Sequence, residues 1–281
     1  MISIIISSYK PDYFSAVEKN IAETCGIPHE IIKIDNPGLI GICEAYNKGA
    51  MMAKYDVLLF IHEDIKFITT DWGSKLIVHH ELERAGVIGV AGGKYIPSAP
   101  SGWYTDNENA LINIVQGKKG ESKKTIQTFS GVQKAFALDG VFLSIKKQIF
   151  TEYKFDEHLE RYHGYDTEIT LRIAKKYLNY VVSDILIEHY SAGNPDLEWN
   201  KANIYIRKKL GSNFHNAFND DLELTLFVNY LHQYFRQNRI NLNSILRTLQ
   251  FFPTKASFRT KRIILKKYYN FIKFRNSYNC E

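Results

Sequence analysis

The sequence lacks several features that define whole classes of proteins. No apolar run approaches the roughly 20 residues that a membrane-spanning helix needs, and residues 1–6 lack the basic segment that begins a signal peptide. The three cysteines, Cys25, Cys43 and Cys280, are odd in number and show no metal-ligand spacing, which is typical of reduced thiols in the cytosol. We therefore expect a cytoplasmic protein, and attachment to a membrane surface stays open.

Two glycine motifs that bind phosphate groups are also missing. No Gly-x-Gly-x-x-Gly follows the first predicted strand, and no Walker-type glycine–lysine loop occurs. The glycine-rich stretch 89–93 follows a later strand and lacks the fingerprint spacing. These absences disfavour dehydrogenases and P-loop enzymes. Without a backbone cradle for phosphate, a metal ion is the more natural way to neutralise a diphosphate.

Acidic residues are absent from a long segment near the C-terminus. The chain carries a formal net charge of +6, and residues 255–275 hold eight basic residues and no Asp or Glu. On a helix, four of the basic residues would share one face and four apolar residues the opposite face. These are Arg259, Arg262, Lys266 and Lys273, and Ile264, Tyr268, Phe271 and Ile272.

Two interpretations of this basic segment stay open. It can be an interfacial helix on an anionic membrane, where long basic side chains reach the headgroups. The favoured alternative is a helix packed on the core with a solvated basic face. No recognised nucleic-acid-binding module accompanies the charge, so we expect no nucleic-acid partner.

The chain does contain enough apolar material for a sizeable core. It has 281 residues, of which 45% are hydrophobic, and this suits one large domain or one domain with an appendage. In the first half, strand patterns alternate with helical patterns, which predicts βαβ units and a mostly parallel, doubly wound sheet. The predicted strands are 3–8, 30–34, 57–61 and 87–90, and the predicted helices are 12–24, 42–53 and 72–85.

The alternation stops after residue 92. Clusters of Gly, Pro, Ser, Asn and Lys in residues 92–129 predict a long irregular loop. Beyond it we expect strands at 135–145 and 179–188, a helix at 166–176 between them, and then helices at 197–210, 221–236, 242–251 and 258–274. The sequence therefore predicts an α/β domain at residues 1–194 and a helical, basic C-terminal extension at 195–281.

One segment, residues 56–64, is the most informative about chemistry. Its apolar run Val57–Ile61 is typical of a strand buried on both faces of a parallel sheet, and His62, Glu63 and Asp64 follow directly. Ligands bind at the carboxyl ends of such strands, where carboxylates can hold a divalent metal and the metal a diphosphate. The alternative is a strand followed by a solvated acidic turn.

Other polar residues follow predicted strands or begin a helix, and each has a structural alternative. Ser7, Ser8 and Tyr9 can line a base or ribose pocket or form a capped turn. Asp35 can accept hydrogen bonds from a nucleoside or form an Asx-turn. Asp166 can cap its helix, and His189 can be structural. Their combination favours a single cleft.

The order of these motifs resembles the GT-A-fold glycosyltransferases, in particular the family-2-like bacterial sugar transferases, over about residues 1–193. Residues 3–10 resemble the opening strand of that family, and residues 40–49 resemble the segment before its metal-binding strand. His62-Glu63-Asp64 resembles a variant Asp-x-Asp motif. Residues 164–168 resemble the Glu-Asp catalytic motif, and residues 189–193 the strand end that carries a histidine.

The resemblance implies a metal-dependent transfer of sugar from a nucleotide-sugar, most simply a UDP-sugar, to an acceptor hydroxyl, with inversion, in bacterial surface polysaccharide or glycoconjugate synthesis. Asp64 and His189 would bind Mn²⁺ or Mg²⁺, and Asp166 would be the general base. Residues on the donor side would be Ser8, Tyr9, Asp35, Asn47, His62 and Glu63. Residues on the side of a saccharide or lipid-linked acceptor would be Trp103, Asp139 and Gly140.

Two positions depart from the family pattern. His62 replaces the first carboxylate of Asp-x-Asp, and Tyr165 replaces the Glu of Glu-Asp. These departures are the best support for one alternative, a non-catalytic nucleotide- or sugar-binding protein on the same fold. A second alternative is a nucleotidyltransferase, which also uses metal at strand ends. A peripheral membrane scaffold is a third alternative, which rests on the basic segment only.

Overall fold

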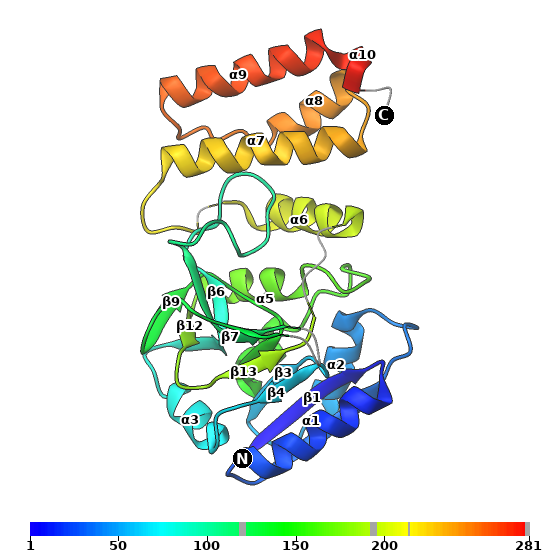
Figure 1. Ribbon diagram of the computed structural model, residues 1–281, viewed down its shortest axis with the longest axis vertical. Helices are drawn as coiled ribbons and strands as arrows, with labels where there is room; N and C mark the ends of the chain where they lie inside the picture. The colour runs from blue at the N-terminus through cyan, green and yellow to red at the C-terminus, as the bar shows by residue number, and fades with distance from the viewer. Residues whose placement is uncertain (118–121, 192–195, 213, 279–281) are drawn as a thin grey trace.

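The computed structural model describes residues 1–117, 122–191, 196–212 and 214–278. Figure 1 shows a part built of sheets with flanking helices, which contains the N-terminus, and a stack of helices that continues away from it towards the C-terminus.

The main sheet has seven strands and is mostly parallel. Strands β1, β2, β3, β5 and β12 run in one direction, and β11 and β9 are antiparallel to their neighbours. The order is β2 (His29–Asp35), β1 (Ile2–Ser8), β3 (Val57–Ile61), β11 (Phe142–Lys146), β5 (Ala85–Gly89), β12 (Leu178–Val182) and β9 (Val132–Ala135). The expected α/β class with a mostly parallel sheet is therefore confirmed.

Both faces of this sheet are covered, as the apolar strands predict. The side chains of β1 alternate between two cores. Ile4 packs on one face with Val17 of α1 (Pro11–Thr24), whereas Ile5 packs on the other face with Tyr46 of α2 (Ile42–Met52). Further helices of this part are α3 (Trp72–His79), α4 (Lys147–Tyr153) and α5 (Tyr165–Ala174).

A second sheet corrects part of the sequence prediction. It consists of β10 (Ala137–Leu138), β6 (Ala91–Gly93), β7 (Ala110–Gln116), β13 (Ile187–His189) and β4 (Ile65–Phe67), and β8 (Lys124–Gln127) pairs with β7. Residues 92–129 are therefore not wholly irregular. The predicted strand 135–145 contains the last residue of β9, then β10 and most of β11, and the predicted strand 179–188 contains most of β12 and of β13. The chain passes from one sheet to the other within each range. The predicted helix 72–85 ends earlier, at His79, and β5 begins at Ala85.

The C-terminal part is helical, as expected. It comprises α6 (Leu197–Leu210), α7 (Asp220–Gln237), α8 (Leu242–Leu249), α9 (Phe258–Lys273) and α10 (Arg275–Tyr278). Helices α7, α8 and α9 share a separate apolar core. Helix α6 lies between the two parts, because Ala202 and Ile206 belong to clusters of the sheet-containing part, whereas Ile204 packs against the core of α7, α8 and α9. The domain boundary at 194/195 falls in or beside residues outside the described ranges and stays a prediction. None of the described helices is both long enough and apolar enough to cross a membrane.

Candidate active site

Two cavities lie at the carboxyl ends of β1 and β3 and share a wall. The first cavity, of about 510 Å³, is lined by Ser7, Tyr9, Asn36, Glu63 and Asp64 among others. The second cavity, of about 610 Å³, is lined by Trp103, Asp139, Gly140, Asp166 and His189 among others. The shared wall consists of His62, Tyr162, Tyr165 and Ser191. Because the same four residues line both cavities, a molecule bound in one cavity would lie next to a molecule bound in the other.

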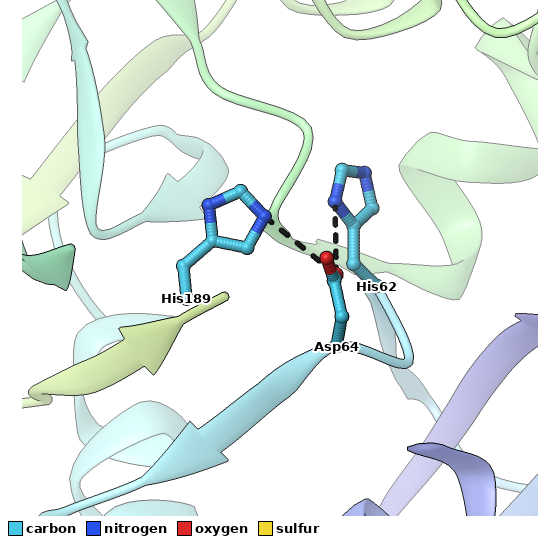
Figure 2. A group of neighbouring side chains, drawn as sticks. All are labelled: His62, Asp64 and His189. Carbon is cyan, nitrogen blue, oxygen red and sulfur yellow. Dashed lines mark ion pairs between the residues drawn. The ribbon is translucent and has the colours of Figure 1, made fainter. Parts of the chain in front are cut away.

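Three side chains converge beside this wall. Asp64 Oδ1 lies 3.6 Å from His189 Nε2 and 3.9 Å from His62 Nδ1, and Figure 2 shows both rings turned towards the carboxylate. The fold explains the convergence, because β3 ends at Ile61 and antiparallel pairing sets His189 opposite Ile65. Each of the three residues offers a ligand atom within 4.8 Å of the others.

This donor set suits a divalent metal. Burial alone would raise the pKa of Asp64, but hydrogen bonding to His189 and the charge that His62 carries when it is protonated at low pH hold that pKa below its usual range. Burial and the neighbouring His189 lower the pKa of His62, so its ring is neutral near pH 7. A neutral imidazole and an ionised carboxylate are the forms that bind metals.

His62 and Tyr165, the two departures from the family motifs, contact each other. His62 Nε2 lies 2.7 Å from the hydroxyl oxygen of Tyr165, which is buried at the start of α5. A Cβ atom at Gly140 would lie only 2.0 Å from that hydroxyl oxygen. Gly140 is therefore required for the position of Tyr165. Because Nε2 of the His62 ring contacts Tyr165, the other ring nitrogen, Nδ1, faces Asp64.

Asp166 is held at the second cavity by backbone donors. The Gly140 N–H donates to Oδ2 at 3.0 Å, and the Thr167 N–H donates to Oδ1 at 2.7 Å. Burial, with a further contribution from the charge of Asp139, raises the pKa of Asp166 to about 7. The carboxyl group can therefore take up and release a proton near neutral pH.

Asp139, whose charge acts on Asp166, also holds Trp103 at the second cavity. The indole N–H of Trp103 donates to Asp139 Oδ2 at 3.0 Å, and the Val141 N–H donates to Oδ1 at 2.8 Å. Both side chains line the second cavity. The hydrogen bond fixes the orientation of an aromatic ring at the cavity wall, where such a ring can stack on a sugar.

Glu63 supports the first cavity through the backbone. Its carboxylate accepts hydrogen bonds from the N–H groups of Tyr9 at 3.1 Å and of Lys10 at 2.8 Å. It thereby ties the turn after β1 to the loop after β3. Glu63 and Tyr9 both line the first cavity, and Glu63 positions Tyr9.

Three residues predicted on the donor side do not line either cavity. Side chains alternate along β1, so that Ser7 lines the first cavity and Ser8 is buried on the other side. The side chain of Asp35 is 78% exposed and pairs with Lys33 at 2.6 Å, and the next residue, Asn36, lines the cavity instead.

Asn47 is the third of these residues. Its amide group donates to the carbonyl oxygen of Phe155 and accepts from the Phe155 N–H, at 2.9 and 3.0 Å. Asn47 therefore ties α2 to the segment after α4. Sequence reasoning offered Ser7 as a pocket residue but missed Asn36 and Tyr165, which also line a cavity. Strand alternation could have separated Ser7 from Ser8, but no local pattern pairs Tyr165 with His62.

Comparison with known proteins agrees with this geometry. Residues 3–206 match the sequence model of a family described as "Glycosyltransferase like family". No curated protein sequence matches the chain significantly. The S. aureus TarS 1–349 structure in complex with UDP matches with a TM-score of 0.56 and 13% identity, over 99% of this chain and 87% of that chain.

A second solved structure is GalNAc-T7 with UDP, GalNAc and Mn²⁺. It matches with a TM-score of 0.53 and 11% identity, over 89% of this chain and 54% of that one. This chain thus spans about half the length of the GalNAc-T7 chain. At these identities the likeness establishes the fold, and the expected GT-A fold with a helical C-terminal region is confirmed.

Proposed function

Because the chain belongs to the glycosyltransferase-like family, whose sequence model covers residues 3–206, we propose that it transfers a sugar from a UDP-sugar to an acceptor hydroxyl, with a divalent metal and with inversion at the anomeric carbon. One observation carries this proposal. The His62–Asp64–His189 cluster and Asp166 lie at two cavities that share a wall. One cavity suits a donor and the other an acceptor.

The nucleotide would occupy the first cavity. Asp64, His189 and also His62 would hold the metal, and a divalent cation bound there would neutralise charge on the leaving diphosphate. Two imidazoles and one carboxylate favour Mn²⁺ over Mg²⁺, which prefers oxygen ligands. The UDP and Mn²⁺ in the GalNAc-T7 structure and the UDP in the TarS structure support this assignment.

The acceptor would occupy the second cavity, where Asp166 acts as the general base. As the acceptor oxygen forms its bond to the anomeric carbon, the bond from that carbon to the diphosphate breaks, and the hydroxyl proton passes to Asp166. The pKa of about 7 suits a base that works near neutral pH. The Gly140 and Thr167 N–H groups hold the carboxylate in place.

Trp103 would provide the stacking face for the acceptor sugar, with its ring fixed by Asp139. A saccharide or lipid-linked saccharide of a bacterial surface polysaccharide or glycoconjugate is the class of acceptor that we propose. A role in such a pathway follows from the family resemblance alone.

A UDP-release assay tests the proposal. Wild-type protein with Mn²⁺ and a panel of UDP-sugars, with saccharide acceptors, is expected to release UDP. Asp166→Asn is expected to lower that rate by about 10²- to 10⁴-fold, because it removes general-base assistance, while UDP binding persists. UDP binding without release for any donor and acceptor would favour a non-catalytic binding protein, and release of pyrophosphate would favour a nucleotidyltransferase.

A further inference from the structure

Helix α9 has three faces rather than two. Figure 1 shows it as the outermost long helix of the stack, far from the sheets. Ile264, Tyr268 and Phe271 are buried in the core shared with α7 and α8. These three residues make up most of the apolar face that the sequence pattern predicts for membrane contact. That face packs against α7 and α8 instead, so it is not available to a membrane.

A second apolar stripe runs along the outside of α9. Phe258, Leu265, Tyr269 and Ile272 are 84%, 56%, 61% and 45% exposed. Their spacing of 7, 4 and 3 residues follows the helical repeat, so they lie on one face. Large apolar side chains on a continuous exposed stripe are characteristic of an interaction surface.

Basic side chains flank this stripe. Arg259, Arg262, Lys266 and Lys273 are exposed, and at 100° per residue they fall directly beside the stripe, on one side of it. None of the four forms a salt bridge with another described residue. Their charges are thus exposed. Within the described residues, the pKa of Asp220 is lowered mainly by hydrogen bonds and further by the charge of Arg259, and Lys273 Nζ lies 5.3 Å from the centroid of the Phe274 ring.

The charge of the whole chain is divided in the same way. Residues 224–280 contain 11 Lys and Arg and no Asp or Glu, which leaves 25 basic against 30 acidic residues in the rest of the chain. The C-terminal helices thus carry strong positive charge on a protein that is otherwise slightly acidic. Such a division favours an anionic partner for this end of the molecule.

Helix α8 extends the exposed apolar surface. Leu242 and Leu246, one helical turn apart, are 70% and 56% exposed. Ser244 and Thr248 of the same helix are buried, and the Tyr268 hydroxyl of α9 donates to Thr248 Oγ1 at 2.9 Å. Helix α8 therefore turns a polar face towards α9 and exposes its leucine side chains to solvent.

We propose that the outer face of α8 and α9 docks on an anionic phospholipid bilayer, with α9 lying in the plane of the interface. Phe258, Leu265 and Ile272 would enter the boundary between headgroups and acyl chains, Tyr269 would lie at headgroup level, and the basic side chains would contact lipid phosphates. This surface is independent of the two cavities and of the proposed transfer reaction.

A bilayer accounts for both halves of the pattern, whereas other partners account for one. A second copy paired through the same face would bring two strongly basic segments together, which like-charge repulsion opposes. Nucleic acid would use the charge but would leave the apolar stripe exposed.

Co-sedimentation of the full-length protein with vesicles tests the proposal. Wild type is expected to bind phosphatidylglycerol-containing vesicles, to bind pure phosphatidylcholine vesicles weakly, and to dissociate from the former in high salt. Leu265→Ser/Tyr269→Ser/Ile272→Ser is expected to lower the partition coefficient about tenfold or more. Arg259→Gln/Arg262→Gln/Lys266→Gln is expected to lower it roughly 100-fold, at about fivefold for each charge.

Matched controls separate docking from general surface effects. Met51→Ser/Val78→Ser removes exposed apolar side chains, and Lys19→Gln/Lys124→Gln/Lys134→Gln removes exposed charges, all outside α8 and α9. Both controls should bind vesicles as wild type does, and thermal unfolding should show that every variant is folded. Equal binding by the α9 variants, equal binding to neutral vesicles, or self-association through this face without vesicle binding would overturn the proposal.

Discussion

At the scale of single residues, Asp166 and its neighbours constrain the chemistry most. Burial raises its pKa, and the negative charge of Asp139 raises it further. Two backbone N–H groups limit the rise. The proposed base is therefore protonated below about pH 7 and ionised above it, so activity should rise with pH through this value.

Replacing Asp139 by Asn tests this pH dependence. The substitution removes a negative charge that favours the protonated form of Asp166, so the pKa of Asp166 should fall. The acidic limb of the plot of kcat/KM against pH should then move to lower pH than in wild type. Steady-state rates between pH 5 and pH 9 measure the shift. A limb that stays in place, or moves to higher pH, would contradict the assignment of Asp166 as the titrating base.

Tyr165 gives a second residue-scale prediction. If Nδ1 of His62 holds the metal, the Nε2–H group would donate a hydrogen bond to the Tyr165 hydroxyl oxygen, 2.7 Å away, and this bond would orient the ring. Partners of this kind typically change metal affinity by about 10- to 100-fold, so Tyr165→Phe should weaken Mn²⁺ binding by that order in calorimetric titrations. The matched control is Tyr180→Phe, a buried tyrosine whose hydroxyl donates to the Glu83 carbonyl. Equal Mn²⁺ affinity in both variants would show that Tyr165 does not orient a ligand.

Sequence reasoning reached some of these residues and not others for a physical reason. Asp64, Asp166 and His189 follow strands or begin a helix, so their neighbours in sequence mark them. The contact between His62 and Tyr165 joins residues 103 positions apart, and only the fold brings them together. Asp35 and Ser8 were misplaced because a single-residue shift along a strand moves a side chain to the other face.

At the scale of elements, buried strands and strongly periodic helices were predictable. Val57–Ile61 has the same bounds in the structure, and so does α6 at Leu197–Leu210. The second sheet was not predictable in the same way. Its strands β4, β6, β10 and β13 have two or three residues each, too few to show a period, and long-range pairing creates them.

An ion pair between α5 and α6 leads to a prediction at the scale of elements. Lys209 Nζ lies 2.8 Å from Glu168 Oε1, a buried carboxylate, and 2.6 Å from Asp156 Oδ2. Lys209→Met leaves both carboxylates without this partner, which should lower the free energy of unfolding by about 1–3 kcal/mol in urea titrations. Lys201→Met, on the same helix, breaks a solvent-exposed ion pair with Glu198. This control should change the free energy of unfolding by about 0.5 kcal/mol or less. Equal losses in the two variants would refute the proposed link.

At the scale of the whole molecule, the helical part is fastened to the sheet-containing part by buried polar contacts. The carboxylate of Glu223 on α7 accepts from the Tyr95 hydroxyl at 2.8 Å and from the Ser98 N–H at 3.1 Å. The sheet-containing part forms the cavities, with Trp199 and Asn203 of α6 lining the second one. Helices α8 and α9 carry the outward basic and apolar surface. The predicted amphipathic pattern of α9 was incomplete, because a helix with three faces does not separate into one polar and one apolar side.

Calorimetric titration of UDP into the wild-type protein, with and without Mn²⁺, tests the central claim most directly. The metal-dependent donor site predicts tight UDP binding only with Mn²⁺, loss of that binding in Asp64→Asn, and its retention in Asp166→Asn, which changes a similar carboxylate in the other cavity. UDP binding that is equally tight without metal, or that survives in Asp64→Asn with Mn²⁺ present, would contradict the account.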